Sequence, residues 1–148
     1  MLIARNLEKL NATAKELQAI GTSQNKQVKT RVITLDLSAP ENLKAKVYER
    51  IYKEKLGDID ISVLINNAGY AQVGYFDEIS EQDVHTQLTC NTYPVILLTQ
   101  QLLKSFKSRY TKFGKRSLLA TTSSIAGHYP IPLLGVYSAS KKFVDSFS

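Results

Sequence analysis

A tyrosine and a lysine lie four positions apart, in the segment Tyr137-Ser138-Ala139-Ser140-Lys141. Residues at this spacing project from the same face of a helix. A cation on that face favours the phenolate form of the tyrosine, which makes Tyr137 a usable acid or base near neutral pH. Ser124 precedes it by thirteen positions, and its hydroxyl can hold the substrate oxygen to which Tyr137 gives a proton.

Strands that alternate with helices are needed to position these side chains, and the apolar pattern predicts them. Four apolar runs predict strands at Leu2–Ala4, Val28–Leu35, Ile61–Ile65 and Ser117–Thr122. Apolar residues at three- and four-residue steps predict four helices: over Leu7–Leu17, through Leu43, Val47 and Ile51 to Gly57, from Ser80 to about Lys107, and from near Tyr137 to Ser148. This alternation predicts a doubly wound, Rossmann-like α/β fold with a parallel sheet.

Smaller signals refine these elements. Ser38 with Glu41 and Ser80 with Asp83 predict helix caps, while Pro94 predicts a kink or break in the long helix. The unbroken apolar run Ile61–Ile65 is typical of a strand that is covered on both faces.

The loops at the carboxyl ends of the strands are where ligands bind in such sheets. Asn66-Asn67-Ala68-Gly69 follows one predicted strand, and Ser123-Ser124 follows the next. Each motif alone is weak, but their order and their places at strand ends are hard to ascribe to chance.

In order and spacing, Asn66–Gly69, Asn91, Ser124, Tyr137 and Lys141 resemble the signature of the short-chain dehydrogenase/reductases. Members of this family move hydride between a nicotinamide cofactor and a carbonyl or alcohol. The resemblance implies that the loop containing Asn67, Ala68 and Gly69 lies beside the cofactor, and that Asn91 holds a water in a proton relay. It also implies that Lys141 binds the nicotinamide ribose. Asp36 resembles the family's aspartate that meets the adenine ring.

Two further stretches, Tyr129–Leu134 and Lys142–Ser148, are similar to the very-long-chain 3-oxoacyl-CoA reductases, a group that includes 17β-hydroxysteroid dehydrogenases. This resemblance implies NADPH, and a 3-oxoacyl-CoA of fatty-acid elongation or a steroid-like ketone as substrate. It also implies the endoplasmic reticulum membrane, reached through segments outside this chain. The alternative for Pro130–Leu134 is apolar packing under the last helix.

Arg5 provides a separate indication of cofactor choice. NAD-preferring sites place an acidic residue at the end of the second strand, whereas the 2′-phosphate of NADPH needs a cation. Here the strand ends Ala4-Arg5-Asn6, without a competing carboxylate. We therefore expect NADPH. The alternative is a surface arginine at the start of a helix.

The family's first strand and its glycine-rich turn are not found in residues 1–148, nor are its later strands and substrate lid. We therefore interpret residues 1–148 as a partial dinucleotide-binding domain, truncated at both ends. In the strand order 3-2-1-4-5 the missing strand lies between those ending at Ala4 and Ile65. We expect two sheet halves, weak NADPH binding by the chain alone, and doubtful activity.

Composition limits other functions. With 43% hydrophobic and 22% charged residues and no apolar run of membrane-spanning length, the chain is expected to be one globular unit. Cys90 is the single cysteine and is interpreted as a small buried thiol, while His85 and His128 lack companion ligands. We therefore predict no metal.

Two alternatives of other classes remain. The basic stretch Lys104–Arg116, with interleaved aromatic residues in a chain of net charge +6, could mark a nucleic-acid surface. The polar end of a helix is the favoured interpretation, and no nucleic-acid partner is predicted. A non-catalytic remnant could instead associate through the helices containing Asn91 and Tyr137, which resemble those through which family members form dimers.

Overall fold

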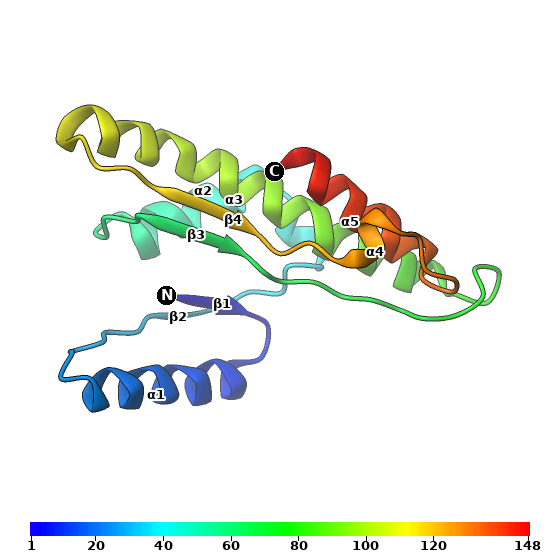
Figure 1. The fold of residues 1–148 in the computed structure, drawn as a ribbon, viewed down its shortest axis with the longest axis horizontal. Coiled ribbons are helices and arrows are strands. Elements are labelled where there is room, and N and C mark those ends of the chain that lie inside the picture. Colours follow the sequence, from blue (N-terminus) through cyan, green and yellow to red (C-terminus); the bar gives the residue numbers. More distant parts are fainter. The chain divides into compact units, whose positions relative to one another are not determined.

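Residues 1–148 are all described by the computed structural model, in two units, Met1–Leu37 and Ser38–Ser148. The first unit contains strand β1 (Leu2–Ala4), helix α1 (Leu7–Ser23) and strand β2 (Val32–Thr34) (Figure 1). The two strands are parallel, with Leu2 opposite Val32. Asn6 caps α1 by accepting a 2.8 Å hydrogen bond from the Lys9 amide. The buried apolar residues of this unit are Leu10, Ala14, Ile33 and Leu37.

The second unit contains the remaining elements (Figure 1). In chain order they are the 3₁₀ turn η1 (Pro40–Asn42), helix α2 (Ala45–Ile51), its π-helical continuation η2 (Tyr52–Leu56), strand β3 (Val63–Asn66), helix α3 (Glu81–Phe113), strand β4 (Leu118–Thr121) and helices α4 (Ile125–His128) and α5 (Gly135–Phe147). Strands β3 and β4 are parallel neighbours, with Val63 opposite Leu118 and Asn66 opposite Thr121.

The sheet is thus formed as two separate parallel pairs, β1–β2 and β3–β4. This is the pairing expected for the predicted strand order without its first strand. The α/β class predicted from the sequence is confirmed, because each parallel pair is connected through a helix. No helix of the structure has both the length and the apolar character needed to cross a bilayer.

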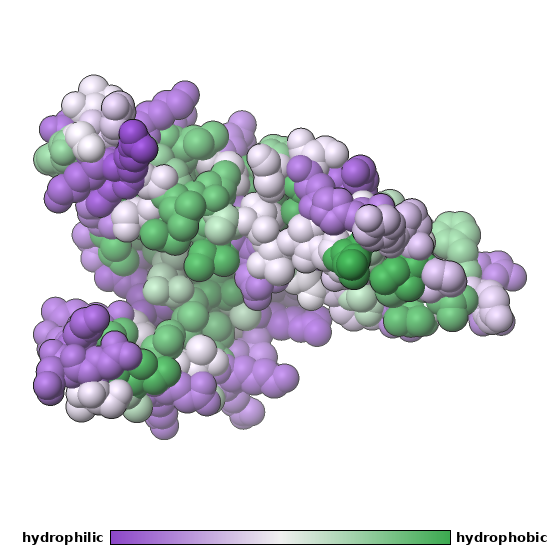
Figure 2. All heavy atoms as spheres, in the orientation of Figure 1, coloured by the Kyte–Doolittle hydropathy of each residue, from purple (hydrophilic) through white to green (hydrophobic).

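Only one face of the β3–β4 pair is covered. Side chains alternate between the faces of a strand, and those of Leu64 and Asn66 are buried on the side where Asn66 contacts Thr99 of α3. On the opposite face Val63, Ile65 and Leu118 are 48%, 63% and 56% exposed, and Figure 2 shows hydrophobic residues gathered over β3 and β4. The prediction that Ile61–Ile65 is covered on both faces is therefore wrong for this structure.

Helix α3 is well defined at both ends. The Asp83 amide donates to Ser80 Oγ at 3.1 Å, and Ser80 Oγ donates to the Asp83 carboxylate at 2.6 Å, which confirms the predicted cap. The helix passes through the buried Pro94 without a break and extends beyond Lys107 to Phe113. It ends at Gly114, whose φ of 63° is in the left-handed region that favours glycine.

Other boundaries differ from the predictions. The second strand covers only Val32–Thr34 of the predicted Val28–Leu35. Ser38 does not cap α2, because a bond from the Leu43 amide to the Pro40 carbonyl closes a separate 3₁₀ turn, and the helix restarts after Lys44. Pro40 does occupy the first turn, and the helical segment ends at Gly57 as predicted.

Candidate active site

The ends of β3 and β4 are held together by the predicted Asn66-Asn67 motif. The Thr122 amide donates to the Asn66 carbonyl at 2.9 Å, and the Thr122 hydroxyl donates to Asn67 Oδ1 at the same distance. The buried Asn66 side chain instead points into the unit and donates to Thr99 Oγ1 at 3.2 Å. The two asparagines therefore fix the loop that follows β3 to both the neighbouring strand and α3.

Asn91 connects this loop to the last helix. Its side chain is 1% exposed. Its Oδ1 accepts from the Tyr70 amide at 2.8 Å, and its Nδ2 donates to the Tyr70 carbonyl at 2.9 Å and to Ser140 Oγ at 2.8 Å. One carboxamide on α3 thus holds both the loop and α5, using its acceptor and both its donor hydrogens.

Lys141 is a buried cation at the centre of this region. The residue is 4% exposed, and its Nζ donates to the Thr122 carbonyl at 2.7 Å. The same Nζ lies 5.8 Å from the centre of the Tyr137 ring, one turn earlier on α5. The four-residue spacing therefore brings the two side chains to one face of the helix, as predicted.

Gly69 brings the loop against these two side chains. A Cβ atom on Gly69 would lie 3.5 Å from Asn91 Oδ1 and 3.6 Å from Lys141 Nζ. Asn67, Ala68 and Gly69 are exposed, so the loop has an open outer surface and a buried ammonium group close behind it. Asn91, Gly69, Tyr137 and Lys141, which are far apart in the sequence, are brought together.

Ser124 and Tyr137 begin neighbouring helical segments. Ser124 is the cap of α4, and its Oγ accepts from the Ala126 amide at 3.2 Å. Both residues are partly exposed. The Ile131 amide donates to Ser138 Oγ at 3.5 Å, which ties the connecting loop to the first turn of α5.

Arg5 and Asp36 belong to the first unit, separately from the residues above. They follow the carboxyl ends of β1 and β2, which the Leu35 amide joins by a 3.0 Å bond to the Ala4 carbonyl. Arg5 is exposed and Asp36 is half-buried. The two predicted cofactor contacts thus lie at the same edge of one strand pair.

Gln87 is a polar residue of the site region that the sequence analysis missed. It is 0% exposed, and its Oε1 accepts from the Gln72 amide at 3.1 Å. The signal that could have found it is its position one turn before Asn91 on α3. Together the two carboxamides bind the loop at residues 70 and 72.

Tyr48 is a second buried polar residue that was missed. It is 2% exposed and its hydroxyl has no hydrogen-bond partner. Burial, with a smaller contribution from Cys90, raises the pKa of Tyr48 to about 12. Cys90 itself is half-buried, so the prediction of a fully buried thiol is wrong.

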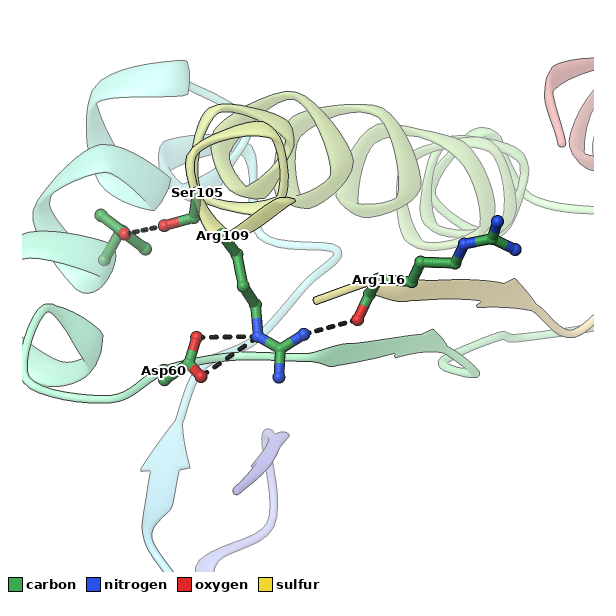
Figure 3. Close-up of polar contacts among 5 residues, drawn as sticks. Asp60, Ser105, Arg109 and Arg116 are labelled. Carbon is green, nitrogen blue, oxygen red and sulfur yellow. Dashed lines mark hydrogen bonds and ion pairs between the residues drawn. The ribbon is translucent and has the colours of Figure 1, made fainter. Parts of the chain in front are cut away.

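The basic stretch at the end of α3 includes a structural contact. Arg109 Nε donates to the two carboxylate oxygens of Asp60 at 3.0 and 3.1 Å, and its Nη1 donates to the Arg116 carbonyl at 2.5 Å. Figure 3 shows this side chain reaching from α3 toward the start of β3. One turn earlier on α3, the Ser105 hydroxyl contacts the Tyr52 hydroxyl. Arg109 therefore anchors the end of the helix.

Comparison with known proteins agrees with the fold and with the family that the sequence resembles. The family model of the short chain dehydrogenases matches residues 1–148. The chain is 32% identical over 152 residues to the very-long-chain 3-oxoacyl-CoA reductase of Bos taurus and 34% identical over 151 residues to that of Anas platyrhynchos. The alignments cover 100% and 99% of this chain, but only 44% of each relative.

Solved structures give the same fold. A short-chain dehydrogenase from Shigella flexneri, complexed with NADP, superposes with a TM-score of 0.78 at 24% identity, over 99% of this chain and 56% of that one. The chain belongs to the short-chain dehydrogenase family.

Proposed function

We propose that the complete protein is an NADPH-dependent reductase of a lipid-like carbonyl, either a 3-oxoacyl-CoA of fatty-acid elongation or a steroid-like ketone. The observation that supports this most strongly is the buried Lys141 ammonium, held between the Thr122 carbonyl and the Tyr137 ring. The names of the two curated relatives support the 3-oxoacyl-CoA as the first substrate to test.

The residues present fit a nicotinamide cofactor. An ammonium group has three donor hydrogens, and the Lys141 Nζ uses one of them on Thr122. A buried ammonium group that has further N–H donors to satisfy favours an oxygen ligand, such as the ribose hydroxyls of the cofactor. Asn67, Ala68 and Gly69 offer an exposed loop surface beside it. NADPH, when bound, supplies the hydride for the carbonyl carbon.

The chain's own residues act on the oxygen of that carbonyl. The Tyr137 phenol donates its proton to the oxygen as negative charge develops there, and the Ser124 hydroxyl holds the same oxygen by a hydrogen bond. Lys141 then stabilises the phenolate that remains, until a proton returns through the relay to which Asn91 belongs. Hydride and proton together convert the ketone to an alcohol.

Arg5 and Asp36, both in the first unit, are proposed as further contacts for the cofactor. The exposed Arg5 follows β1, so its guanidinium is available to a 2′-phosphate, and its fork of donors matches phosphate geometry. Asp36, at the end of the neighbouring strand, is proposed to contact the adenine ring.

The cellular context of the complete protein is also a proposal. We propose the endoplasmic reticulum membrane, reached through segments outside residues 1–148, because the relatives are very-long-chain 3-oxoacyl-CoA reductases. A homodimer through α3 and α5 is supported by the outward Phe143 and Phe147, which are 39% and 41% exposed and stack at 6.0 Å.

A reductase assay tests the proposal. The complete protein should oxidise NADPH only when a 3-oxoacyl-CoA or a steroid ketone is added, and Tyr137→Phe should lose turnover while it retains NADPH affinity. The control is Tyr110→Phe, at an exposed tyrosine of α3, which should change neither. If Tyr137→Phe stays within about tenfold of wild type, a gap too small for loss of a general acid, the assignment is wrong.

A further inference from the structure

Helix α4, which begins directly after Ser124, packs unusually close to α5. A Cβ atom on Gly127 would lie 3.0 Å from the backbone carbonyl carbon of Lys141 and 2.6 Å from Asp145 Oδ2. The Asp145 carboxylate could shift away, but the Lys141 backbone carbonyl, whose oxygen would lie 3.1 Å from the added atom, leaves little room, so the close approach favours glycine at this position. The short helix α4, capped by Ser124, therefore packs closely against α5, the helix that contains Tyr137 and Lys141.

Asp145 has a carboxylate oxygen that this packing leaves without a hydrogen-bond donor. Its side chain is 15% exposed, and Oδ2 is buried and receives no hydrogen bond. Burying a charged oxygen without a donor is costly, so such an atom calls for an explanation. The ion pair found for Asp145 is with His128 at the end of α4, whose Nε2 lies 3.7 Å from Oδ2.

His128 can supply the missing donor. Its imidazole is 62% exposed, so a small rotation toward Oδ2 meets little obstruction from the protein. The imidazolium donates through both ring nitrogens, and the neutral ring donates through one of them. Lys141, one turn before Asp145 on α5, donates instead to Thr122.

We propose that a contact between His128 and the Asp145 carboxylate joins α4 to α5, and so fixes the position of Ser124 relative to Tyr137 and Lys141. His128 is one helical turn after Ser124, and Asp145 is one turn after Lys141. The contact thus joins the helix of the proposed oxygen-holding residue to the helix of the proton donor. Both are positioning residues, and the inference rests on the proposed reductase function.

The test uses four single variants and one double variant of the complete protein. His128→Leu and Asp145→Asn should each lower kcat about tenfold or more, because small misplacements of reacting groups are expensive. The KM for NADPH should stay unchanged, since Lys141 is untouched. His128→Gln places an amide N–H near the position of Nε2 and should restore most of the rate. The control is His85→Leu, at the other histidine, which pairs with Glu81 on the surface of α3.

The double variant His128→Leu/Asp145→Asn should be no slower than the worse single variant, because both lose the same contact. Independent, multiplicative losses would overturn the proposal, as would a His128→Gln variant as slow as His128→Leu. If the wild type reduces no carbonyl, the proposed function fails. The His128–Asp145 contact is then tested by thermal unfolding of the wild type, the two single variants His128→Leu and Asp145→Asn, and the double variant, where strictly additive midpoint shifts for the two residues would overturn it.

Discussion

Replacing Asn91 with alanine should destabilise the complete protein substantially, and the structure gives the magnitude. The change removes three hydrogen bonds of 2.8, 2.9 and 2.8 Å, two to the Tyr70 backbone and one to Ser140 Oγ. Each neutral bond contributes about 0.5–1.5 kcal/mol. The expected loss for the three bonds is therefore about 1.5–4.5 kcal/mol in the free energy of unfolding. Reductase activity should fall as well, because the loop beside Lys141 loses its anchor.

Denaturant unfolding of the complete protein, monitored by circular dichroism, measures this loss. The matched control is Gln82→Ala on the same helix, where the amide donates to Thr86 in an exposed position. Substitutions at exposed positions of this kind usually change the free energy of unfolding by no more than about 0.5 kcal/mol. An Asn91→Ala variant as stable as the control would refute the view that this carboxamide holds the loop to α5.

Three further outcomes are expected. Arg5→Glu should shift the preference from NADPH toward NADH, and an unchanged ratio of the two kcat/KM values would make Arg5 only a surface residue. Lys141→Ala should both lower kcat and weaken cofactor binding, measured separately by turnover and by titration; a change in only one would contradict the dual role. Burial raises the pKa of Tyr48 from 10.0 to about 12, so the folded state should be unaffected by this group below pH 10 and should lose stability as pH rises from 10 through 12, where ionisation favours the unfolded chain. Tyr48→Phe, which removes a buried hydroxyl without a partner, should leave the free energy of unfolding at neutral pH unchanged or raise it by about 1 kcal/mol, and should weaken that alkaline loss; a clear destabilisation at neutral pH would contradict this.

Strongly periodic segments were predictable from sequence, and contacts between distant segments were not. The capped start of α3 at Ser80 and the strand over Leu118–Thr121 follow from local residue patterns. The strand ending at Thr34 is shorter than predicted, since the preceding Lys29-Thr30-Arg31 lie outside the register with β1. The four-residue helix α4 is too short to leave a periodic signal.

The same distinction between local patterns and long-range contacts applies to the candidate site. The pairing of Tyr137 with Lys141 follows from a four-residue spacing on one helix, and the structure shows it. The burial of Gln87 was not predicted, because its only signal is its position one turn before Asn91, and a glutamine on a helix is ordinarily interpreted as a surface residue. The approach of His128 to Asp145 depends on how α4 is seated on α5, which no local pattern specifies.

The most direct test of the proposed chemistry follows the hydride itself. The complete protein would be incubated with a 3-oxoacyl-CoA and NADPH deuterated at the transferable nicotinamide position, and the acyl product would be examined by mass spectrometry. We predict a 3-hydroxyacyl-CoA that contains one deuterium on its new alcohol carbon, and none from Tyr137→Phe in the same time. Recovery of the 3-oxoacyl-CoA unchanged, or of an alcohol without deuterium, would contradict hydride transfer by this protein. Equal behaviour of wild type and Tyr137→Phe would contradict the assistance of this tyrosine.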